Sequence, residues 1–355
     1  MLSKLTIIAA VCAASALAGW KQLSTLDLVA LDLKFSSETE GYISGGENGV
    51  EGIQLAKTTD GGLSFNTTTI PNTTLPLSIS IAINPPHILV NGLFDNFITH
   101  DDGNTWSKPI GADVGQALWS IYSQGKFFIP GAGLWGTGIA VSEDNGYVFK
   151  GIKIPVLEKG SIPRFSAHPT ADVWYVSAGA QPQEVDDDPL DDDPPTVTAT
   201  ARSLKHTEGG NVAQMVKTTD GGKTWESQLY STGKFYFMDI DCADTNTCCV
   251  NSEADTMSPT LGIAIYCTFD GKTWNTTYTD YTAGQSLMDI KYLGNNNWVA
   301  SGTFEADNAV RATFVRSSDN GKTWTPDEDT TTPQLAVVAS SWPAPNVGFA
   351  LGIDR

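Results

Sequence analysis

Apolar residues along the chain occur in short runs, and turn-forming residues separate one run from the next. The sequence is rich in Thr, Ser, Asn and Asp and contains 34 glycines and 18 prolines among its 355 residues. These residue types favour tight turns, so the pattern is typical of many short β-strands. No long stretch shows the 3.6-residue apolar period of an amphipathic helix. The pattern therefore predicts an all-β protein, and this length suits one large domain.

One strand–turn–strand pattern, in which the second strand ends in a small or glycine-rich step, recurs seven times. The predicted hairpins are 28–46, 77–92, 117–133, 162–179, 235–252, 286–302 and 335–352. Repeats spaced by roughly 40–50 residues are typical of the blades of a β-propeller.

An eight-residue pattern, S/T-x-D-x-G-x-T-W, lies between the hairpins. Copies begin at residues 58, 99, 142, 218 and 317, and a contracted copy begins at residue 268. Its carboxylate can accept hydrogen bonds from backbone amides, its glycine can adopt a positive φ, and its aromatic residue can pack over the hairpin. We therefore predict structural and not catalytic roles for its aspartates, which are Asp60, Asp101, Asp144, Asp220, Asp270 and Asp319.

This pattern resembles the Asp-box, or BNR, repeat of the sialidase-like and sortilin-like superfamily. The resemblance covers nearly the whole chain after residue 18. It implies a seven-bladed β-propeller in which each blade has an inner hairpin and two outer strands joined by the Asp-box turn. Residues 20–27 would supply an outer strand from the N-terminus and close the last blade. That blade is still one strand short, so either it has three strands or the natural chain continues past Arg355.

Residues 1–18 have the features of a secretory signal peptide. Lys4 provides a positive charge, residues 5–17 are apolar or small, and Ala16-Leu17-Ala18 matches an A-x-A cleavage site. A membrane anchor is the alternative, but the apolar run is too short to cross a bilayer. We therefore predict cleavage after Ala18, one propeller domain over residues 19–355, and a secreted protein without membrane insertion.

Three N-x-[ST] sequons are consistent with secretion and predict glycosylation at Asn66, Asn72 and Asn275.

Four cysteines remain after the predicted cleavage: Cys242, Cys248, Cys249 and Cys267. In a secreted protein this number predicts two disulfides. Adjacent cysteines bond to each other with difficulty, so Cys248 and Cys249 should each pair with Cys242 or Cys267, in either arrangement. Because CxxC spacing and a nearby histidine are both missing, we predict no metal at these cysteines.

The formal charge of −19 argues against nucleic acid and anionic lipid as partners, since both need a basic surface.

The longest departure from the blade spacing is at residues 181–210, where aspartates and prolines are concentrated. Such a segment cannot form a core, so we predict a solvated, disordered loop. Carboxylates at short spacing leave Ca²⁺ as an alternative, although the turn glycine of an EF-hand is absent. No other cofactor is predicted.

The innermost strand of each blade should line the axial channel of the propeller, where ligands gather. Alignment of the inner strands places seven side chains at one level: Asp32, Ser80, Ser120, Arg164, Asp239, Asp289 and Val338. The three carboxylates could bind a cation or a sugar, or act as an acid/base set in which mutual repulsion raises one pKa. Their repetition favours the alternative, in which they bond strand-end amides and channel water. We predict ligand contacts for Arg164, Ser120 and Trp135, since a tryptophan in a glycine-rich loop can stack on sugar rings.

The resemblance also limits the activity. Sialidases need three arginines, a Tyr–Glu pair and an [FY]-R-I-P motif before the first box. Here no arginine precedes the first box, and Ile162-Pro163-Arg164-Phe165 is scrambled and follows the third. Xyloglucan-active members usually pair two propellers, whereas this chain has one. These departures favour a protein that binds without catalysing a reaction.

The single-propeller format looks most like the photosystem II assembly-factor type, which acts by binding. Residues 238–250 resemble the strand–Cys–turn–Cys–strand unit of that group, although its basic patch is absent. The resemblance implies a non-enzymatic binding or scaffold protein, which we expect to be a monomer with an extracellular protein or glycan as its partner. The alternative is a glycoside hydrolase of the same fold, with Asp32, Asp239 and Asp289 as its carboxylates.

Overall fold

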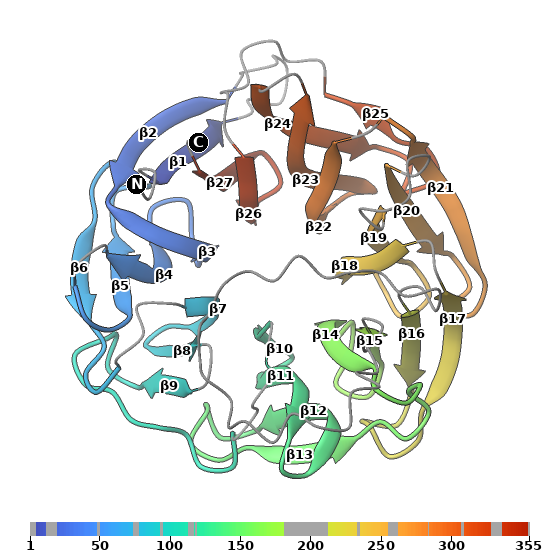
Figure 1. The fold of residues 1–355 in the computed structure, drawn as a ribbon, viewed down its shortest axis with the longest axis horizontal. Coiled ribbons are helices and arrows are strands. Elements are labelled where there is room, and N and C mark those ends of the chain that lie inside the picture. Colours follow the sequence, from blue (N-terminus) through green and yellow to red (C-terminus); the bar gives the residue numbers. More distant parts are fainter. Residues whose placement is uncertain are drawn as a thin grey trace, which may run out of the picture.

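The computed structural model describes residues 5–11, 20–47, 50–73, 78–92, 95–112, 117, 119–180, 212–232, 235–254, 262–282, 284–306, 309–327 and 336–353. Across these ranges all regular structure is β, with 27 strands and no helix. The strands form antiparallel sheets arranged radially around a central axis (Figure 1). The predicted all-β propeller is therefore confirmed. Residues 181–211, which contain the predicted acidic insertion, lie outside the described ranges.

Five sheets are each built from four consecutive strands, with the first strand innermost. The first of these sheets contains β3 (Leu28–Phe35), β4 (Gly41–Glu47), β5 (Gln54–Thr58) and β6 (Asn66–Thr69), and the second contains β10 (Ile121–Ser123), β11 (Lys126–Gly133), β12 (Gly136–Ser142) and β13 (Lys150–Lys153). The third contains β14 (Ile162–Ala167), β15 (Trp174–Ala180), β16 (Val212–Thr218) and β17 (Glu226–Thr232), and the fourth contains β18 (Phe235–Cys242), β19 (Cys248–Ala254), β20 (Ile263–Thr268) and β21 (Trp274–Asp280). The fifth contains β22 (Gln285–Gly294), β23 (Asn297–Ala306), β24 (Ala309–Ser317) and β25 (Thr325–Pro326).

The sheet that joins the two chain ends has the order β2-β1-β27-β26. Its bounds are Leu5–Val11 for β1, Lys21–Leu26 for β2, Ala336–Ala344 for β26 and Val347–Ile353 for β27. The outermost position of β2 agrees with the predicted closure of the last blade by an N-terminal strand. The strand that the sequence left missing is β1, which comes from the apolar part of the predicted signal peptide.

The remaining sheet has only three described strands, β7 (Ser78–Asn84), β8 (His87–Gly92) and β9 (Asn96–Thr99). The prediction of seven blades is therefore corrected: six sheets are four-stranded blades, and the sheet that is second in the ring, not the last one, has only three described strands. On the edge of β9 away from β8, Ser107 is the only described residue that pairs with the strand, through two hydrogen bonds of 2.9 Å with Ile98. Pro109 stands two residues later, and because proline has no amide hydrogen it cannot continue a ladder.

The hydrophobic core lies between neighbouring sheets. Ile43 and Ala56 from one sheet pack with Phe349 and Leu351 from the previous one, and similar clusters fill the other interfaces. Each sheet is thus covered on both faces by its neighbours, which is why the strands contain long buried stretches.

Both disulfides are formed within the sheet β18 to β21. Cys242 pairs with Cys248 across the turn between β18 and β19, and Cys249 pairs with Cys267 between β19 and β20. The predicted pairs are confirmed, and the open connectivity is resolved. Together they link the three inner strands of this sheet.

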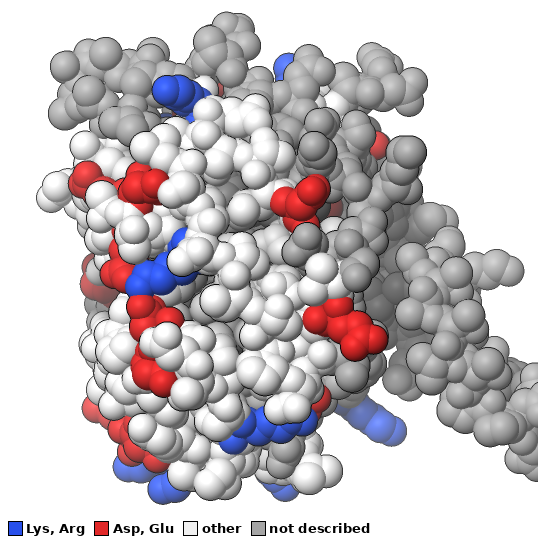
Figure 2. Space-filling view, turned by 90° about the vertical axis from the view of Figure 1, so that its left-hand side faces the viewer, with Lys and Arg blue, Asp and Glu red and all other residues white. Residues whose placement is uncertain are grey.

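The two faces of the ring differ. The eight-residue turns join the third and fourth strands, so they lie on the face opposite the beginnings of the inner strands. On the side of the ring drawn in Figure 2, acidic and basic residues are scattered over a mostly uncharged surface, without a continuous basic area. Within the described ranges, the search for an apolar helix of membrane-spanning length finds none.

Candidate functional site

The aspartates of the eight-residue turns bind their own turns. In the first copy, Asp60 accepts hydrogen bonds from Thr58 Oγ1 (2.8 Å), Ser64 N (2.9 Å) and Ser64 Oγ (2.6 Å). These bonds hold the pKa of Asp60 down to about 2. Backbone amides bind the corresponding carboxylate in the other five copies, at Asp101, Asp144, Asp220, Asp270 and Asp319. Each of these aspartates therefore stabilises the turn that contains it.

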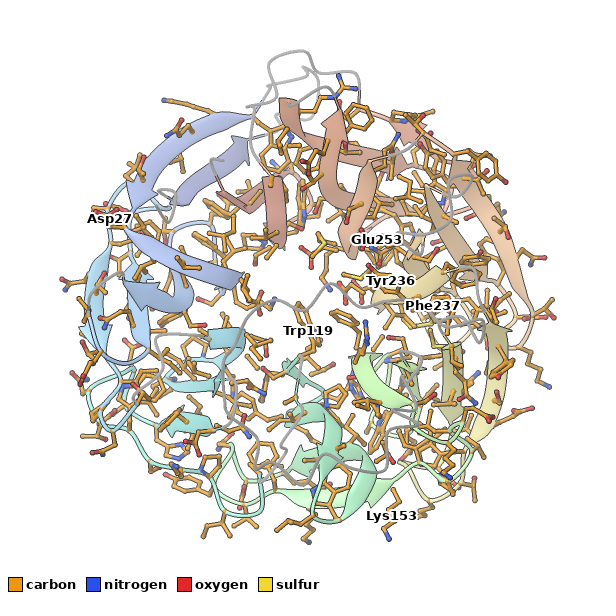
Figure 3. All side chains as sticks on the ribbon, in the orientation of Figure 1. Asp27, Trp119, Lys153, Tyr236, Phe237 and Glu253 are labelled. Atoms are coloured by element: carbon orange, nitrogen blue, oxygen red, sulfur yellow. A yellow bond between two sulfur atoms is a disulfide. The ribbon has the colours of Figure 1, made fainter. Side chains whose placement is uncertain are left out.

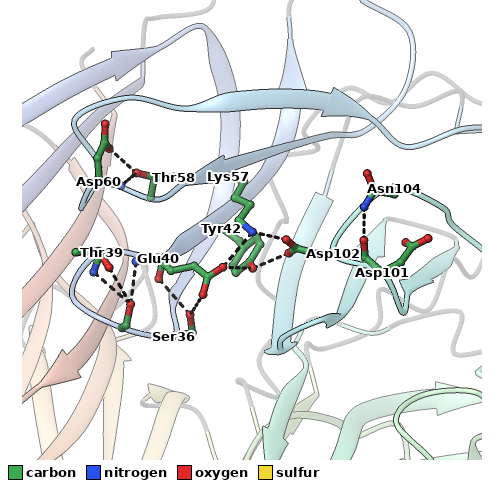
Figure 4. A network of polar contacts seen from close by, with 11 residues as sticks. Ser36, Thr39, Glu40, Tyr42, Lys57, Thr58, Asp60, Asp101, Asp102 and Asn104 are labelled. Atoms are coloured by element: carbon green, nitrogen blue, oxygen red, sulfur yellow. Dashed lines mark hydrogen bonds and ion pairs between the residues drawn. The ribbon is translucent and has the colours of Figure 1, made fainter.

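A second polar cluster, centred on Tyr42, also serves the packing of sheets (Figure 4). The Tyr42 hydroxyl donates to Asp102 Oδ1 (2.7 Å) and Glu40 Oε1 (3.0 Å), and Lys57 forms ion pairs with the same two acids. Burial lowers the pKa of Lys57, but its bonds to Asp102 and Glu40 outweigh burial and raise it. Since Asp102 belongs to the turn of the next sheet, the cluster joins two blades.

Six of the seven inner strands, all except β10, have a β-bulge at one level of the channel. The extra residues are Leu31, Ile79, Arg164, Met288 and Val338, and the bulge of β18 lies between Phe237 and Ile240. Asp32 and Asp289 follow the bulge, whereas Arg164 and Val338 occupy it. The predicted alignment is therefore wrong by one residue at these two positions. Arg164 corresponds to Leu31 and Met288, not to the carboxylates.

Asp32 joins the first inner strand to the next one. Its Oδ2 accepts a hydrogen bond from Ile81 N (3.0 Å), and its Oδ1 forms an ion pair with Lys34 (2.7 Å). Lys34 Nζ also lies 4.2 Å from the centre of the Trp119 ring, which Figure 3 shows near the middle of the ring of blades. Burial raises the pKa of Asp32, and Lys34 opposes that change. The side chain is fully buried.

Asp239 and Asp289 make equivalent contacts in the following sheets. Asp239 Oδ2 accepts from Ile290 N (3.4 Å) and pairs with Lys291 (2.9 Å), while Asp289 Oδ2 accepts from Ser340 N. Burial, followed by the charge of Asp239, raises the pKa of Asp289 to about 7. Only 1% of Asp239 and 3% of Asp289 is exposed. All three predicted carboxylates therefore bind the backbone of the next blade and have almost no access to a ligand.

The sequence analysis missed a fourth carboxylate of this kind, Asp241. Its Oδ2 accepts a hydrogen bond from Tyr292 N (2.9 Å), and burial raises its pKa. The signal was available in the aligned strands, because Asp241 stands two residues after Asp239, where the matching strands have Lys34 and Lys291. In β18 an acid therefore stands where β3 and β22 have a lysine, and the charge of Lys291 opposes the rise in the pKa of Asp241.

Two of the three predicted ligand-binding residues have structural contacts instead. Ser120 is fully buried and lies 3.1 Å from Ser80 Oγ, between two blades. Trp135 is half-buried, and its ring lies so close to Gly151 that a Cβ there would come within 2.2 Å of it. Ser120 is therefore enclosed between two blades, whereas part of the Trp135 side chain remains exposed.

Arg164, the third predicted ligand contact, lies on the inner strand β14 and is half-buried. Its guanidinium carbon lies 5.6 Å from the centre of the Tyr236 ring, and burial lowers its pKa. No ion pair of Arg164 is found within the described part of the chain. The Tyr236 hydroxyl donates to Glu253 Oε2 (2.6 Å), and burial raises the pKa of Glu253. We call this group of three residues the channel mouth.

The channel mouth lies on the face opposite the eight-residue turns, because Arg164 and Tyr236 are near the beginnings of their inner strands. Tyr236 and Glu253 lie together beside the channel in Figure 3. At the same end of β18 to β21 there is a pocket of about 130 Å³, lined in part by Phe235, Tyr266 and Tyr281. This volume suits a single ring or one apolar side chain, since an apolar cavity of about 150 Å³ holds benzene. No sequence motif marked Tyr236, Glu253 or the pocket.

The described residues contain no group of three or more His, Cys, Asp or Glu arranged to hold a metal ion. The acidic segment that left Ca²⁺ as an alternative lies outside them. All three sequon asparagines are exposed: Asn66 begins β6, Asn72 lies in the turn after that strand, and Asn275 lies in β21.

No family model and no curated protein matches the chain. Solved structures do match its fold. A structure of YCF48 bound to D1 peptide is 14% identical, with a TM-score of 0.58 over 92% of this chain and 90% of the other. YCF48 from Cyanidioschyzon merolae is 16% identical, with a TM-score of 0.58 over 95% and 97%. A PL25 ulvan lyase bound to a disaccharide repeat is 11% identical, with a TM-score of 0.57 over 89% and 88%.

Proposed function

We propose that this protein is a secreted binding propeller that holds an extracellular protein or glycan at the channel mouth. The observation that carries the proposal is the contrast between the channel carboxylates and Arg164. Asp32, Asp239 and Asp289 are buried and bind the backbone of neighbouring blades, whereas Arg164 lies at the channel without an ion pair among the described residues.

Two features make the channel mouth suitable for a ligand with both polar and apolar groups. The Arg164 guanidinium can donate hydrogen bonds, and the aromatic pocket at the same end of β18 to β21 can take a ring or an apolar side chain. Similar folds have such ligands, because one structure of YCF48 contains D1 peptide and the ulvan lyase contains a saccharide. We further propose that the eight-residue turns are Asp-boxes and that the chain is a glycoprotein with a cleaved leader.

The first test is binding. The secreted protein is screened on glycan and peptide arrays, and each hit is measured in solution for the wild type and for Arg164→Ala. Loss of a desolvated charged contact should weaken binding by roughly 10-fold to 100-fold. Arg311→Ala is the matched control, because Arg311 is also an arginine over an aromatic ring, 4.4 Å from Phe304, but it is exposed and lies in another sheet. Equal binding by both variants would remove the channel mouth from the proposal.

A glycoside hydrolase is the second candidate, and one observation favours it. The pKa of Asp289 is near 7 beside Asp239, as in carboxylate pairs that share acid and base roles. Such an enzyme needs two accessible carboxyl groups about 5 to 9.5 Å apart. A glycosidase screen that includes Asp239→Asn distinguishes the two candidates. Hydrolysis by the wild type that this substitution abolishes would establish the enzyme and overturn the binding proposal.

A further inference from the structure

The third strand of the sheet that closes the ring has an unusual origin. β1 pairs antiparallel with β27 over seven residues and with β2 over five, so it fills the position between them (Figure 1). Its residues, Leu5–Val11, are the apolar part of the predicted signal peptide. In the other six sheets the third strand comes from the same chain segment as its neighbours. Cleavage after Ala18 would therefore remove a strand from the middle of a sheet.

The outer wall of this position, β2, is held by contacts that do not involve β1. Trp20, which precedes it, is buried and stacks on Phe314 with ring centres 4.1 Å apart. Ser24 Oγ donates to the carbonyl of Gly62 in the next sheet (2.7 Å). Leu23 also packs against the core cluster between these sheets. β2 is thus fixed to both neighbouring sheets.

The inner wall, β27, is equally independent of β1. Phe349 stacks on Phe35 of the next sheet with ring centres 3.6 Å apart, and Leu351 is fully buried in the same cluster. β27 also pairs with β26 along its length. Both walls should therefore stay in place when β1 is removed. Because adjacent strands are about 4.8 Å apart, β2 and β27 would face each other across roughly 10 Å.

We propose that the cleaved protein has a strand-acceptor slot between β2 and β27, and that an extended, uncharged apolar segment of a partner chain binds there as the missing strand. Two facing edges leave unpaired amide and carbonyl groups, and an inserted strand would pair with both at once. The segment seated there in the intact chain, Leu-Thr-Ile-Ile-Ala-Ala-Val, has the required chemistry: no charge, no proline, and only small or β-branched residues after its first leucine. The incoming strand would run antiparallel to both walls, as β1 does.

This inference depends on the proposed leader cleavage and is separate from the channel mouth. The slot lies between outer strands of the closing sheet, whereas Arg164 and Tyr236 lie on inner strands of other sheets. Arg164→Ala should therefore leave strand binding unchanged, so the two proposals can fail independently.

The experiment uses the secreted protein, whose first residue is established by intact mass spectrometry. It is titrated with a synthetic peptide of residues 5–11 that carries terminal lysines for solubility. We expect one peptide per protein, a raised Tm, and slower hydrogen exchange of the amides of 21–26 and 347–353. The same peptide with Ile8→Pro is the control. Ile8 pairs with both Gln22 and Ala350, and proline removes its amide, so binding should weaken by about tenfold or more.

A second control is the full chain with Ala18→Arg, which blocks cleavage and keeps the leader strand attached. If the slot exists, this protein should not bind the peptide, because β1 already fills the position. Four results would overturn the proposal: a secreted chain that retains residues 5–11, equal affinity for the two peptides, slow exchange without peptide of the β27 amides that point away from β26 into the slot, or a dimer in which a second copy fills the slot.

Discussion

At the scale of single residues, the channel shows how position decides the role of a carboxyl group. Asp289 and Asp60 are both aspartates that accept backbone hydrogen bonds, but they differ in exposure. In the turn, hydroxyl and amide donors around Asp60 stabilise its charge and lower its pKa. In the channel wall, burial disfavours the charge of Asp289, and Asp239 adds repulsion. The two groups should therefore respond to pH in opposite ways.

Asp289→Asn should make stability less sensitive to pH. The pKa of Asp289 is about 7 in the folded protein and lower in the unfolded chain. Between those two values the folded state binds more protons, so the free energy of unfolding falls as pH rises. Asparagine keeps an acceptor for Ser340 N but cannot ionise. As the pH rises from about 5 to about 8, the free energy of unfolding of the variant should therefore increase relative to that of the wild type by on the order of 1–3 kcal/mol.

Urea denaturation at several pH values measures this change. Asp60→Asn serves as the control, because the pKa of Asp60 is about 2, and both its folded and unfolded forms are ionised above about pH 5. Its effect on the free energy of unfolding should be constant across the range. A constant difference for Asp289→Asn as well would contradict the assignment of a raised pKa to this group.

At the scale of strands and turns, the sequence predicted those elements that depend on residues close together in the chain. The inner hairpins and the eight-residue turns carry their own signals, since glycine, asparagine and aspartate mark each turn. The bulge that displaces Arg164 carries no such signal, because an extra residue in one strand shows only when the strands are paired. The channel mouth was missed for the same reason. Tyr236 and Glu253 stand 17 residues apart on adjacent strands, and only the register of that pairing places them opposite each other.

Gly321 provides a test of how one turn packs against the next sheet. It has a φ of 84°, and a Cβ there would lie 2.7 Å from Cys249 Sγ and 3.1 Å from Cys267 Sγ, the disulfide of the preceding sheet. Gly125 has a similar φ of 76° with open space around it. Gly125→Ala should therefore cost about 1–2 kcal/mol from backbone strain alone. Gly321→Ala should cost roughly 1–3 kcal/mol more because of overpacking.

Chemical denaturation of both alanine variants gives the two free energies of unfolding, and their difference isolates the contact with the disulfide. Gly321→Ala should also regain part of the difference when Cys249 and Cys267 are both replaced by alanine, because the sulfur atoms are then absent. Equal costs for the two glycine substitutions would mean that this turn does not pack on the disulfide as described.

At the scale of the whole molecule, closure of the ring depends on a sheet that contains strands from both ends of the chain. The sequence predicted this closure from residues 20–27, which were expected to supply an outer strand of the last blade. Trp20 is 7% exposed, stacks on Phe314 and meets Trp342 edge to face at 5.9 Å. It thus joins the N-terminal strand to a neighbouring sheet and to the C-terminal hairpin. Removal of the Trp20 ring should therefore destabilise the packing that closes the ring of blades more than it destabilises the strand pairing within any one sheet.

Trp20→Ala should therefore lower the free energy of unfolding by about 3–5 kcal/mol, as expected for a buried tryptophan. Trp106→Ala is the matched control, because Trp106 is only half-buried and bonds within its own turn, to Gly103 O at 3.1 Å. It should cost about 1–2 kcal/mol. If Trp20 closes the ring, its loss should also expose residues 20–26 to limited proteolysis under native conditions, since opening of the closing sheet frees β2. Equal costs for the two variants, with no new cleavage near the N-terminus, would show that the ring is closed by the pairing of strands alone.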